Sequence, residues 1–387
     1  MTLAARDRLD DVALLEAADP SGMLRQVASS AAQVREAARS AAEASLDEIM
    51  AGGRPRAIVI TGMGGSGIAG EVLAAVAGPG CPVQVITVHD YRLPGWVGAA
   101  DLVIAVSCSG ATEETLSAAE EAVRRGCRLL GVGSKGSPLA GLAEQARAAF
   151  IGVHAIGMPR SMLWGLSVPL VAAAARLGVL EVPGQVYESA AAELERVAHL
   201  CRPDSEAFVN PAKALALDLS GTLPMIWGTS PLTGVAAARF ACQLHENGKH
   251  PAVAGVLPEA NHNQVVVFDG PFAPGYAALG YAGHGVAAAE GNGQATGRQA
   301  APLPLRLVLL RDTREHPQVA RRREESARIA AERGIEVTEL AAAGDHPLER
   351  LASLVSLIDF TSVYLAIAAG IDPAPIVAIQ ELKARIA

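Results

Sequence analysis

The sequence predicts an α/β protein built from two doubly wound parallel sheets of the flavodoxin-like or Rossmann-like kind, with flanking helices. In the first half, apolar β-branched runs alternate with helical patterns, beginning with a strand at 57–60 and a helix after Gly67. A second alternation begins with a strand at 224–228 and a helix at 235–244. Because strands that alternate with helices form parallel sheets, the two repeats predict two such domains.

The remaining elements follow in chain order. Residues 24–50 contain neither Gly nor Pro and are expected to form one leading helix that ends at Gly52. A helix is also expected at about 185–201. Further strands are expected at 83–88, 102–106, 129–132, 149–153, 265–268, 305–310 and 335–340.

These elements divide the chain into segments. We expect an N-terminal helical segment at 1–50, a first sheet domain at 51–155, bridging helices at 156–205 and a second sheet domain at 206–387. Residues 276–302 are rich in Gly and Ala and poor in large apolar residues, so they are expected to be a loop insertion. Residues 373–387 are expected to be a C-terminal helix.

The composition favours a soluble globular protein. Half of the 387 residues are apolar, which is enough to bury substantial cores. A net charge of −8 argues against nucleic acid or an anionic membrane as the main partner, because either needs a concentrated basic surface. The run Arg321 to Arg323 precedes Glu324 and Glu325, which is typical of a solvated, salt-bridged helix face.

Cysteine usage favours a cytoplasmic protein. The five cysteines are scattered and form no CxxC pair, as expected for reduced thiols. The N-terminus has charges where a signal peptide needs its apolar core, and no run reaches about 18 uncharged apolar residues.

Two loops carry the chemistry of the first domain. Gly62, Gly64 and Gly67 fit GxGxxG, so a dinucleotide site is one interpretation. The second loop, SCSGATEET at 107–115, places hydroxyls and a glycine just before a helix, which together form a neutral cradle for phosphate. A dinucleotide site leaves this second loop unexplained. Ordinary helix capping and turn chemistry, for which Ser and Thr are common residues, is the other alternative.

The second domain contains a polar stretch, HENGKHPAVAGVLPEANHN at 245–263, which we interpret as the catalytic centre. Glycine and proline keep most of it from being helical, so we expect a loop. Zinc is an alternative, but His245 and His250 are one position too far apart for HExxH and Gly248 interrupts the helix. No metal is therefore expected.

These motifs resemble a known family. GMGGSGIAGE and SCSGATEET resemble the sugar isomerase (SIS) domain, and ENGKHPA, LPEANHNQV and PIVAIQELK resemble the bifunctional phosphoglucose/phosphomannose isomerases, which have two SIS domains. The resemblance runs from about residue 55 to the end, except for 276–302. This sequence departs from the family's usual residues at Gly67, Ala111, His250 and Gln264.

The resemblance implies specific roles. Arg160 lies near the reacting carbons, Glu246 is the base, His262 opens the sugar ring, and Lys383 is the lysine near the C-terminus. Structural alternatives stay open: a solvated Glu246, a structural His262, a surface Lys383 and an ion-paired Arg160. The implied phosphate site consists of Gly65, Ser66, Ser107, Ser109 and Thr112.

The implied activity is interconversion of glucose 6-phosphate, and also mannose 6-phosphate, with fructose 6-phosphate through a cis-enediol(ate). Proton transfer between C1 and C2 needs a carboxylate shuttle and no redox cofactor, so no cofactor is expected. The expected partners are a phosphorylated hexose and a second copy of the chain in a homodimer. A sugar-phosphate-binding regulatory protein without turnover is the alternative.

Overall fold

A computed structural model describes residues 3–275 and 303–386, so the predicted insertion at 276–302 lies outside the described residues. The chain forms two compact units, each made of separate segments. We call them the N-sheet unit and the C-sheet unit. The N-sheet unit comprises Asp19–Arg202 and Ala343–Phe360, and the C-sheet unit comprises Met1–Ala18, Pro203–Ala342 and Thr361–Ala387.

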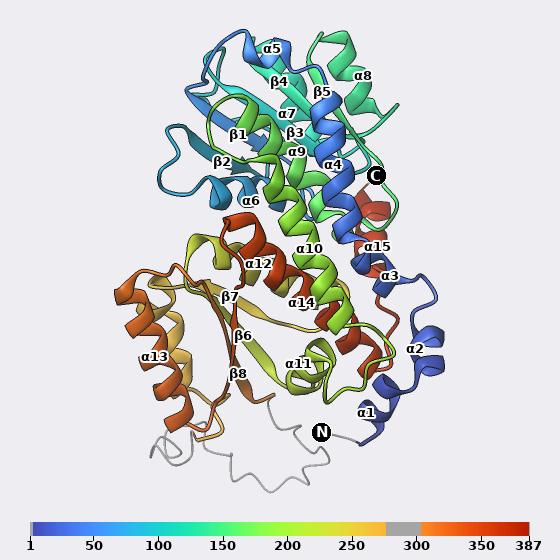
Figure 1. The fold of residues 1–387 in the computed structure, drawn as a ribbon, viewed down its shortest axis with the longest axis vertical. Helices are drawn as coiled ribbons and strands as arrows, with labels where there is room; N and C mark the ends of the chain where they lie inside the picture. The colour runs from blue at the N-terminus through green and yellow to red at the C-terminus, as the bar shows by residue number, and fades with distance from the viewer. Residues whose placement is uncertain (1–2, 276–302, 387) are drawn as a thin grey trace, which may run out of the picture. The chain divides into compact units, whose positions relative to one another are not determined.

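The N-sheet unit contains a five-stranded parallel sheet in the order β2-β1-β3-β4-β5, with helices packed against its strands (Figure 1). The predicted parallel fold is thus confirmed here, and the central strands β1 and β3 are buried along their whole length. The strands are β1 (Ala57–Thr61), β2 (Gln84–Val88), β3 (Leu102–Ser107), β4 (Arg128–Ser134) and β5 (Ala149–Val153).

The single leading helix predicted at 24–50 is wrong, because three helices occupy that stretch: α3 (Met23–Ala28), α4 (Ser30–Glu43) and α5 (Asp47–Met50). The hydroxyls of Ser29 and Ser30 donate to the carbonyls of Gln26 and Val27 at 2.7 Å, and such local bonds compete with helix continuation. The unit's other helices are α6 (Ile68–Ala77), α7 (Glu113–Arg124), α8 (Pro138–Gln145), η1 (Pro159–Ser161), α9 (Leu163–Arg176) and α10 (Gly184–Leu200).

The C-sheet unit contains a four-stranded parallel sheet in the order β7-β6-β8-β9. It confirms the second predicted sheet. Its strands are β6 (Leu223–Gly228), β7 (Val253–Val256), β8 (Leu305–Arg311) and β9 (Glu336–Ala341). The order matches that of the first four strands of the N-sheet, with the first strand flanked by the second and the third.

The strand predicted at 265–268 is wrong, since this run forms the short helix η3 (Gln264–Asp269). Only the last side chain of the run, Phe268, is buried, and it stacks on Trp227 with ring centroids 5.5 Å apart. The sheet position is instead filled by β7, inside the stretch that was expected to be a loop. Gln264 fixes this arrangement, because its amide accepts from Trp227 Nε1 at 2.6 Å and donates to Ala254 O at 3.1 Å.

Helices complete the C-sheet unit. Lys213, fully buried on α11, donates to the backbone carbonyls of Leu9, Pro203 and Ser205, and so ties the N-terminal helix into this unit. The helices are α1 (Leu3–Asp10), α2 (Val12–Ala18), α11 (Pro211–Leu219), α12 (Pro231–Glu246), η2 (Glu259–His262), α13 (Pro317–Glu332) and α15 (Val377–Ile386).

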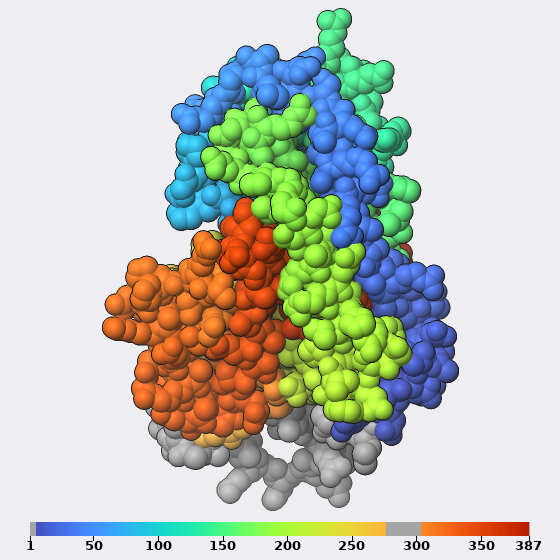
Figure 2. Space-filling model, viewed as in Figure 1, coloured from blue at the N-terminus to red at the C-terminus, as the bar shows by residue number. Residues whose placement is uncertain are grey.

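The arginine run lies on α13, whose outer side forms part of the surface in Figure 2. Arg321 and Arg322 are exposed, as expected for a solvated face. Arg323 differs from that expectation, because it is buried and pairs with Glu315 at 3.2 Å and with Glu339 at 2.6 Å.

The helix α14 (Pro347–Ala368) contributes its residues up to Phe360 to the N-sheet unit and the rest to the C-sheet unit. Within residues 3–275 and 303–386 it is the one helix long and apolar enough to cross a membrane, and 94% of its most apolar 18-residue window is buried. Such burial is typical of a core helix.

Candidate active site

The two glycine- and serine-rich loops leave neighbouring strands of the N-sheet. β1 and β3 pair directly, whereas β2 lies on the other side of β1. The connections after β1 and β3 therefore diverge, and the carboxyl ends of these strands form the topological switch point where open α/β sheets bind ligands. The loops 62–67 and 107–112 both begin at this point.

Backbone crowding explains the glycines of the first loop. Gly64 has φ +52°, in the left-handed region that favours glycine. A Cβ on Gly62 would lie 2.9 Å from Val106 O, and one on Gly65 would lie 3.0 Å from Pro159 O. The loop can thus pack closely on the next strand and on η1 only without side chains at these positions.

One serine hydroxyl joins the two loops, and further hydroxyls bond within the second loop. Ser66, buried, accepts a hydrogen bond from the backbone N–H of Cys108 at 3.1 Å. On the second loop, Ser107 Oγ and Thr112 Oγ1 lie 2.9 Å apart. Ser109 is exposed on the same loop, and its hydroxyl accepts from Ala111 N at 3.2 Å. The structure brings Ser66, Ser107 and Thr112 together and leaves Ser109 open to solvent.

Turn chemistry accounts for part of this arrangement, because Ser109 Oγ accepts from Ala111 N at 3.2 Å and Ser107 Oγ accepts from Thr112 N at 3.4 Å, whereas helix capping does not. Thr112 is the N-cap residue of α7 and Gly67 that of α6, and in the described part of the chain neither makes a side-chain cap hydrogen bond. Both helices thus begin with backbone N–H groups that a bound anion can use. Burial raises the pKa of the Cys108 thiol, so this neighbouring group stays protonated near neutral pH.

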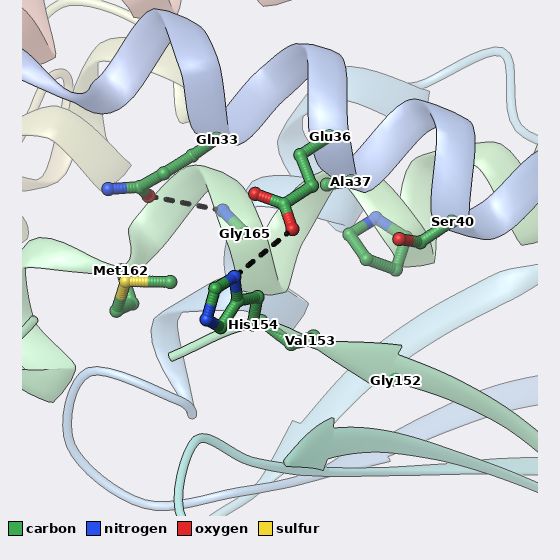
Figure 3. A pocket seen from close by; sticks show the side chains of 10 residues that line it. Gln33, Glu36, Ala37, Ser40, Gly152, Val153, His154, Met162 and Gly165 are labelled. Carbon is green, nitrogen blue, oxygen red and sulfur yellow. Dashed lines mark hydrogen bonds and ion pairs between the residues drawn. The ribbon is translucent and has the colours of Figure 1, made fainter. Parts of the chain in front are cut away.

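Arg160 belongs to η1 and is buried. Its Cα lies 3.4 Å from the position of a Cβ on Gly65, so the arginine's backbone packs on the first loop. Two glutamines from the leading helices hold this turn. Gln26 Oε1 accepts from Met158 N at 2.8 Å, and Gln33 Nε2 donates to Ser161 O at 2.8 Å. Gln33 also accepts from Gly165 N at 3.3 Å (Figure 3).

Glu246 is the last residue of α12 and is half-buried. The turn after it is fixed on both sides. Asn247, fully buried, donates to Ser362 Oγ at 2.9 Å. The Lys249 ammonium donates to Glu246 O at 2.8 Å and to Pro373 O at 3.0 Å. Glu246 therefore sits at a rigid helix end.

His262 ends η2 and has an exposed side chain. Its neighbours hydrogen-bond to other side chains: Asn261 donates to Ser326 Oγ at 2.7 Å, and Asn263 donates to the Glu259 carboxylate at 3.0 Å. Glu259 thus supports this turn. Lys383 lies exposed on α15, a helix with no buried residue.

The histidines considered for zinc contact backbone groups. His245 Nε2 lies 3.3 Å from Ala252 O, and His250 Nε2 lies 2.8 Å from Thr222 O. Burial lowers the pKa of His250. Over residues 3–275 and 303–386, no three or more His, Cys, Asp or Glu side chains form a group that could hold a metal ion.

Comparison with known proteins identifies the family. The model of the bacterial phospho-glucose isomerase C-terminal SIS domain matches residues 208–386. The chain is 32% identical over 330 residues to the bifunctional phosphoglucose/phosphomannose isomerase of Caldicellulosiruptor bescii, covering 85% of this chain and 89% of that protein. This chain belongs to the bifunctional phosphoglucose/phosphomannose isomerase family. The family expected from the motifs is confirmed.

Further matches agree with membership of this isomerase family. The family member of Aquifex aeolicus is 29% identical over 331 residues, covering 85% of this chain and 89% of that one. A solved structure described as a hypothetical protein of Thermus thermophilus superposes with a TM-score of 0.65 at 18% identity, over 99% of this chain and 93% of that one. At that identity the likeness shows a common fold.

The expected site residues of this isomerase family member fall into two sets. The phosphate loops and Arg160 belong to the N-sheet unit, whereas Glu246, His262 and Lys383 belong to the C-sheet unit. No local pattern indicated Gln26 or Gln33, because glutamine on a polar helix is ordinary and their partners Met158 and Ser161 lie 132 and 128 residues away.

Proposed function

We propose that this protein isomerises phosphorylated hexoses, converting glucose 6-phosphate and mannose 6-phosphate to fructose 6-phosphate and back. The observation that carries the proposal is the joined pair of hydroxyl-rich loops at the switch point of the N-sheet, in a chain of this isomerase family. The relatives' printed names give the two sugar phosphates. A regulatory protein without turnover would need only the loops.

The substrate phosphate binds at the loops containing Gly65, Ser66, Ser107, Ser109 and Thr112. Hydroxyl donors and the amino ends of α6 and α7 stabilise a dianion without a fixed counter-charge, since each donates a hydrogen bond and both helix dipoles favour negative charge. Exposed Ser109 can turn toward the phosphate at the cost of one hydrogen bond to Ala111.

Proton transfer is assigned to the other residues. His262 exchanges a proton with the ring oxygen and opens the sugar, with Lys383 donating to the same region. Glu246 then takes the proton from C2 of the aldose and returns it to C1, while the hydroxyl proton of the C2 oxygen passes to the C1 oxygen and leaves a ketone at C2. Arg160 stabilises the cis-enediolate that forms between these steps. Both C2 epimers share this intermediate once the C2–C3 bond rotates.

The protein is further proposed to act as a cytoplasmic homodimer. All five cysteines are free, which suits a reducing compartment. The helix α15 exposes Ile379 by 39%, Leu382 by 59% and Ile386 by 73%, which share one side of the helix at i, i+3, i+7 spacing, and a second copy of the chain is the occupant expected for this apolar side. Light scattering at micromolar concentration is expected to give twice the chain mass, and a monomer would contradict the proposal.

Turnover by the purified, metal-stripped protein is the direct test. Fructose 6-phosphate in D₂O should yield glucose and mannose 6-phosphates with deuterium at C2, because the enediol takes its C2 proton from a group that exchanges with solvent. Glu246→Gln should lower kcat by about 10²- to 10⁴-fold while KM stays within about threefold, since a general base acts on the chemical step. Glu332→Gln is the matched control, an exposed carboxylate that likewise ends a helix of the C-sheet unit and has no assigned role in catalysis.

The outcomes separate the alternatives. Phosphosugar binding without product would favour the regulatory protein, and full activity in Glu246→Gln would remove this residue as the base. Activity should persist in EDTA. Loss of activity that added Zn²⁺ restores would instead support metal catalysis.

A further inference from the structure

His89 lies directly after β2 and contacts the first phosphate loop. Its Nδ1 lies 2.9 Å from Gly62 O. Because a carbonyl oxygen only accepts, Nδ1 carries the hydrogen and donates it. The other ring nitrogen, Nε2, lies 3.5 Å from a carboxylate oxygen of Glu71, on the first turn of α6. The ring therefore connects Gly62, the first residue of the loop 62–67, with α6, the helix that follows the loop.

Gly67 leaves room for this ring. A Cβ on Gly67 would lie 2.6 Å from His89 Cε1 and 2.8 Å from His89 Nδ1, closer than real Cβ contacts. It would also lie 2.8 Å from Gly62 O, the carbonyl that His89 holds. Gly67 has an ordinary helical φ of −66°, so its backbone conformation does not require glycine. The imidazole and the Gly62 carbonyl are what exclude a side chain at this position.

We propose that His89 is a positioning residue for the substrate phosphate, acting through the loop 62–67, and that His89, together with the Gly62 carbonyl it holds, excludes a side chain at Gly67. This inference rests on the proposed function of that loop. By holding Gly62 O against the start of α6, His89 fixes the backbone N–H groups of the loop and of the first helical turn in the direction of the phosphate. Loss of this hydrogen bond lets the loop relax before phosphate binds, so the effect falls on binding rather than on the chemical step.

The Glu71 carboxylate adds a second restraint. With Nδ1 donating to Gly62, the contact with Glu71 is an ion pair only when the ring carries a proton on both nitrogens. Both side chains are partly exposed, at 46% for His89 and 38% for Glu71, so this pair contributes less than the hydrogen bond to Gly62. Removal of the imidazole should therefore weaken phosphate binding more than Glu71→Gln does.

A double-mutant cycle tests the coupling. The proteins are wild type, His89→Ala, Gly67→Ala and the double variant, with His89→Asn as the conservative change that keeps a donor. Gly80→Ala, where a Cβ meets nothing within 4 Å, is the control for glycine, and His154→Asn, from an exposed pair with Glu36 at 3.6 Å, is the control for histidine. The measurements are kcat and KM for fructose 6-phosphate, the Kd of inorganic phosphate by calorimetry, and the thermal midpoint.

Loss of one hydrogen bond should raise KM and the phosphate Kd of His89→Ala about 3- to 15-fold, with kcat within about twofold. His89→Asn should recover most of that loss. Gly67→Ala should raise both constants at least about 10-fold in the wild type and by a factor at least about threefold smaller when His89 is already Ala, because only the contact with the Gly62 carbonyl then remains. The two control variants should match the wild type.

Equal costs of Gly67→Ala in both backgrounds would overturn the coupling. A fall in the thermal midpoint with unchanged KM and phosphate Kd would show that His89 is merely structural. Phosphate binding also separates this inference from the proposed activity. If the wild type binds phosphate without turning over sugar, the isomerase proposal fails while the phosphate Kd of the variants still decides the role of His89.

Discussion

Replacement of Gln33 by leucine tests whether the leading helices hold the turn that carries Arg160. The Gln33 side chain is 3% exposed and uses both ends of its amide, on Ser161 O at 2.8 Å and on Gly165 N at 3.3 Å. Gly165 is in the first turn of α9, whose N-cap Met162 makes no side-chain cap hydrogen bond in the described structure. Gln33 thus caps α9 from another helix.

The expected loss in free energy of unfolding follows from two backbone groups, Ser161 O and Gly165 N, which lose their hydrogen-bond partner. A buried polar group left unsatisfied costs about 1–3 kcal/mol, and the shared origin of the two bonds makes the costs less than additive. Leucine has a volume similar to that of glutamine and leaves no cavity of note. We therefore expect Gln33→Leu to lower the free energy of unfolding by about 2–4 kcal/mol.

The same change should reduce catalysis. Ser161 follows Arg160 directly, so a loosened Ser161 carbonyl shifts the arginine that is proposed to stabilise the enediolate. A displacement of about 1 Å in such a group can cost about 10²-fold in rate. We expect kcat to fall at least about 10-fold while the Kd of inorganic phosphate, which reports the loops alone, changes less than about threefold.

Urea denaturation and steady-state kinetics provide the measurements. Glu36→Gln is the matched control on the same helix, because it affects only the exposed pair with His154, a contact worth about 0–1 kcal/mol (Figure 3). A Gln33→Leu protein as stable as the wild type would refute the hydrogen-bond argument. A destabilised protein with unchanged kcat would refute the positioning of Arg160.

Three further predictions concern the C-sheet unit. Burial lowers the pKa of His250, so the unfolded chain binds its proton at a higher pH than the folded chain does, and stability falls as pH drops below about 6.5. In His250→Asn the urea midpoint should therefore change less between about pH 7 and pH 5 than it does in the wild type. An equal change in both proteins would contradict this. Lys213→Met leaves three carbonyls without their ammonium donor and should cost about 2–4 kcal/mol in urea denaturation, with faster proteolysis near residue 10. Calorimetry should find one phosphate bound per chain, because at the corresponding end of the C-sheet the Asp312 carboxylate, which accepts a hydrogen bond from Ser230 at 2.7 Å, would repel phosphate. Two equivalent sites would contradict this.

Local sequence patterns predicted most of the sheets. Every strand of the N-sheet falls within a few residues of its expected range, because four of the strands are largely buried and appear as apolar runs, and the more exposed β2 is the β-branched run QVITV. The run VVVF at 265–268 has the same composition and forms η3 instead. Val266 is 65% exposed there, so strand propensity lost to the packing of Phe268 on Trp227 and to the bonds of Gln264.

The site was predictable only in part. The hydroxyls of Ser66, Ser107 and Thr112 could be placed together from sequence, since parallel strands bring their carboxyl ends to one edge. The roles of Glu246, His262 and Lys383 remain predictions. The supporting residues Gln33 and His89 could not be predicted from sequence. Gln33 acts through hydrogen bonds to residues far away in sequence, and His89 acts through a ring that packs on Gly67 and bonds to Gly62. The sequence offered one indication, which is that Gly67 departs from the family's usual residue at a position where the His89 ring leaves no room for a side chain.

The two sheets share a strand order but differ in the chemistry of their switch points. In the C-sheet the loops after β6 and β8 meet as Ser230 and Asp312, and Ser230 Oγ donates to the Asp312 carboxylate at 2.7 Å. Ser230 also caps α12 by accepting from Thr233 N at 3.2 Å. The position that hydroxyls and open helix ends offer to an anion in the N-sheet is here filled by the protein's own carboxylate, which would repel phosphate. We therefore expect no phosphate site at this end of the C-sheet, and the helix that Ser230 caps, α12, ends at Glu246, the proposed base.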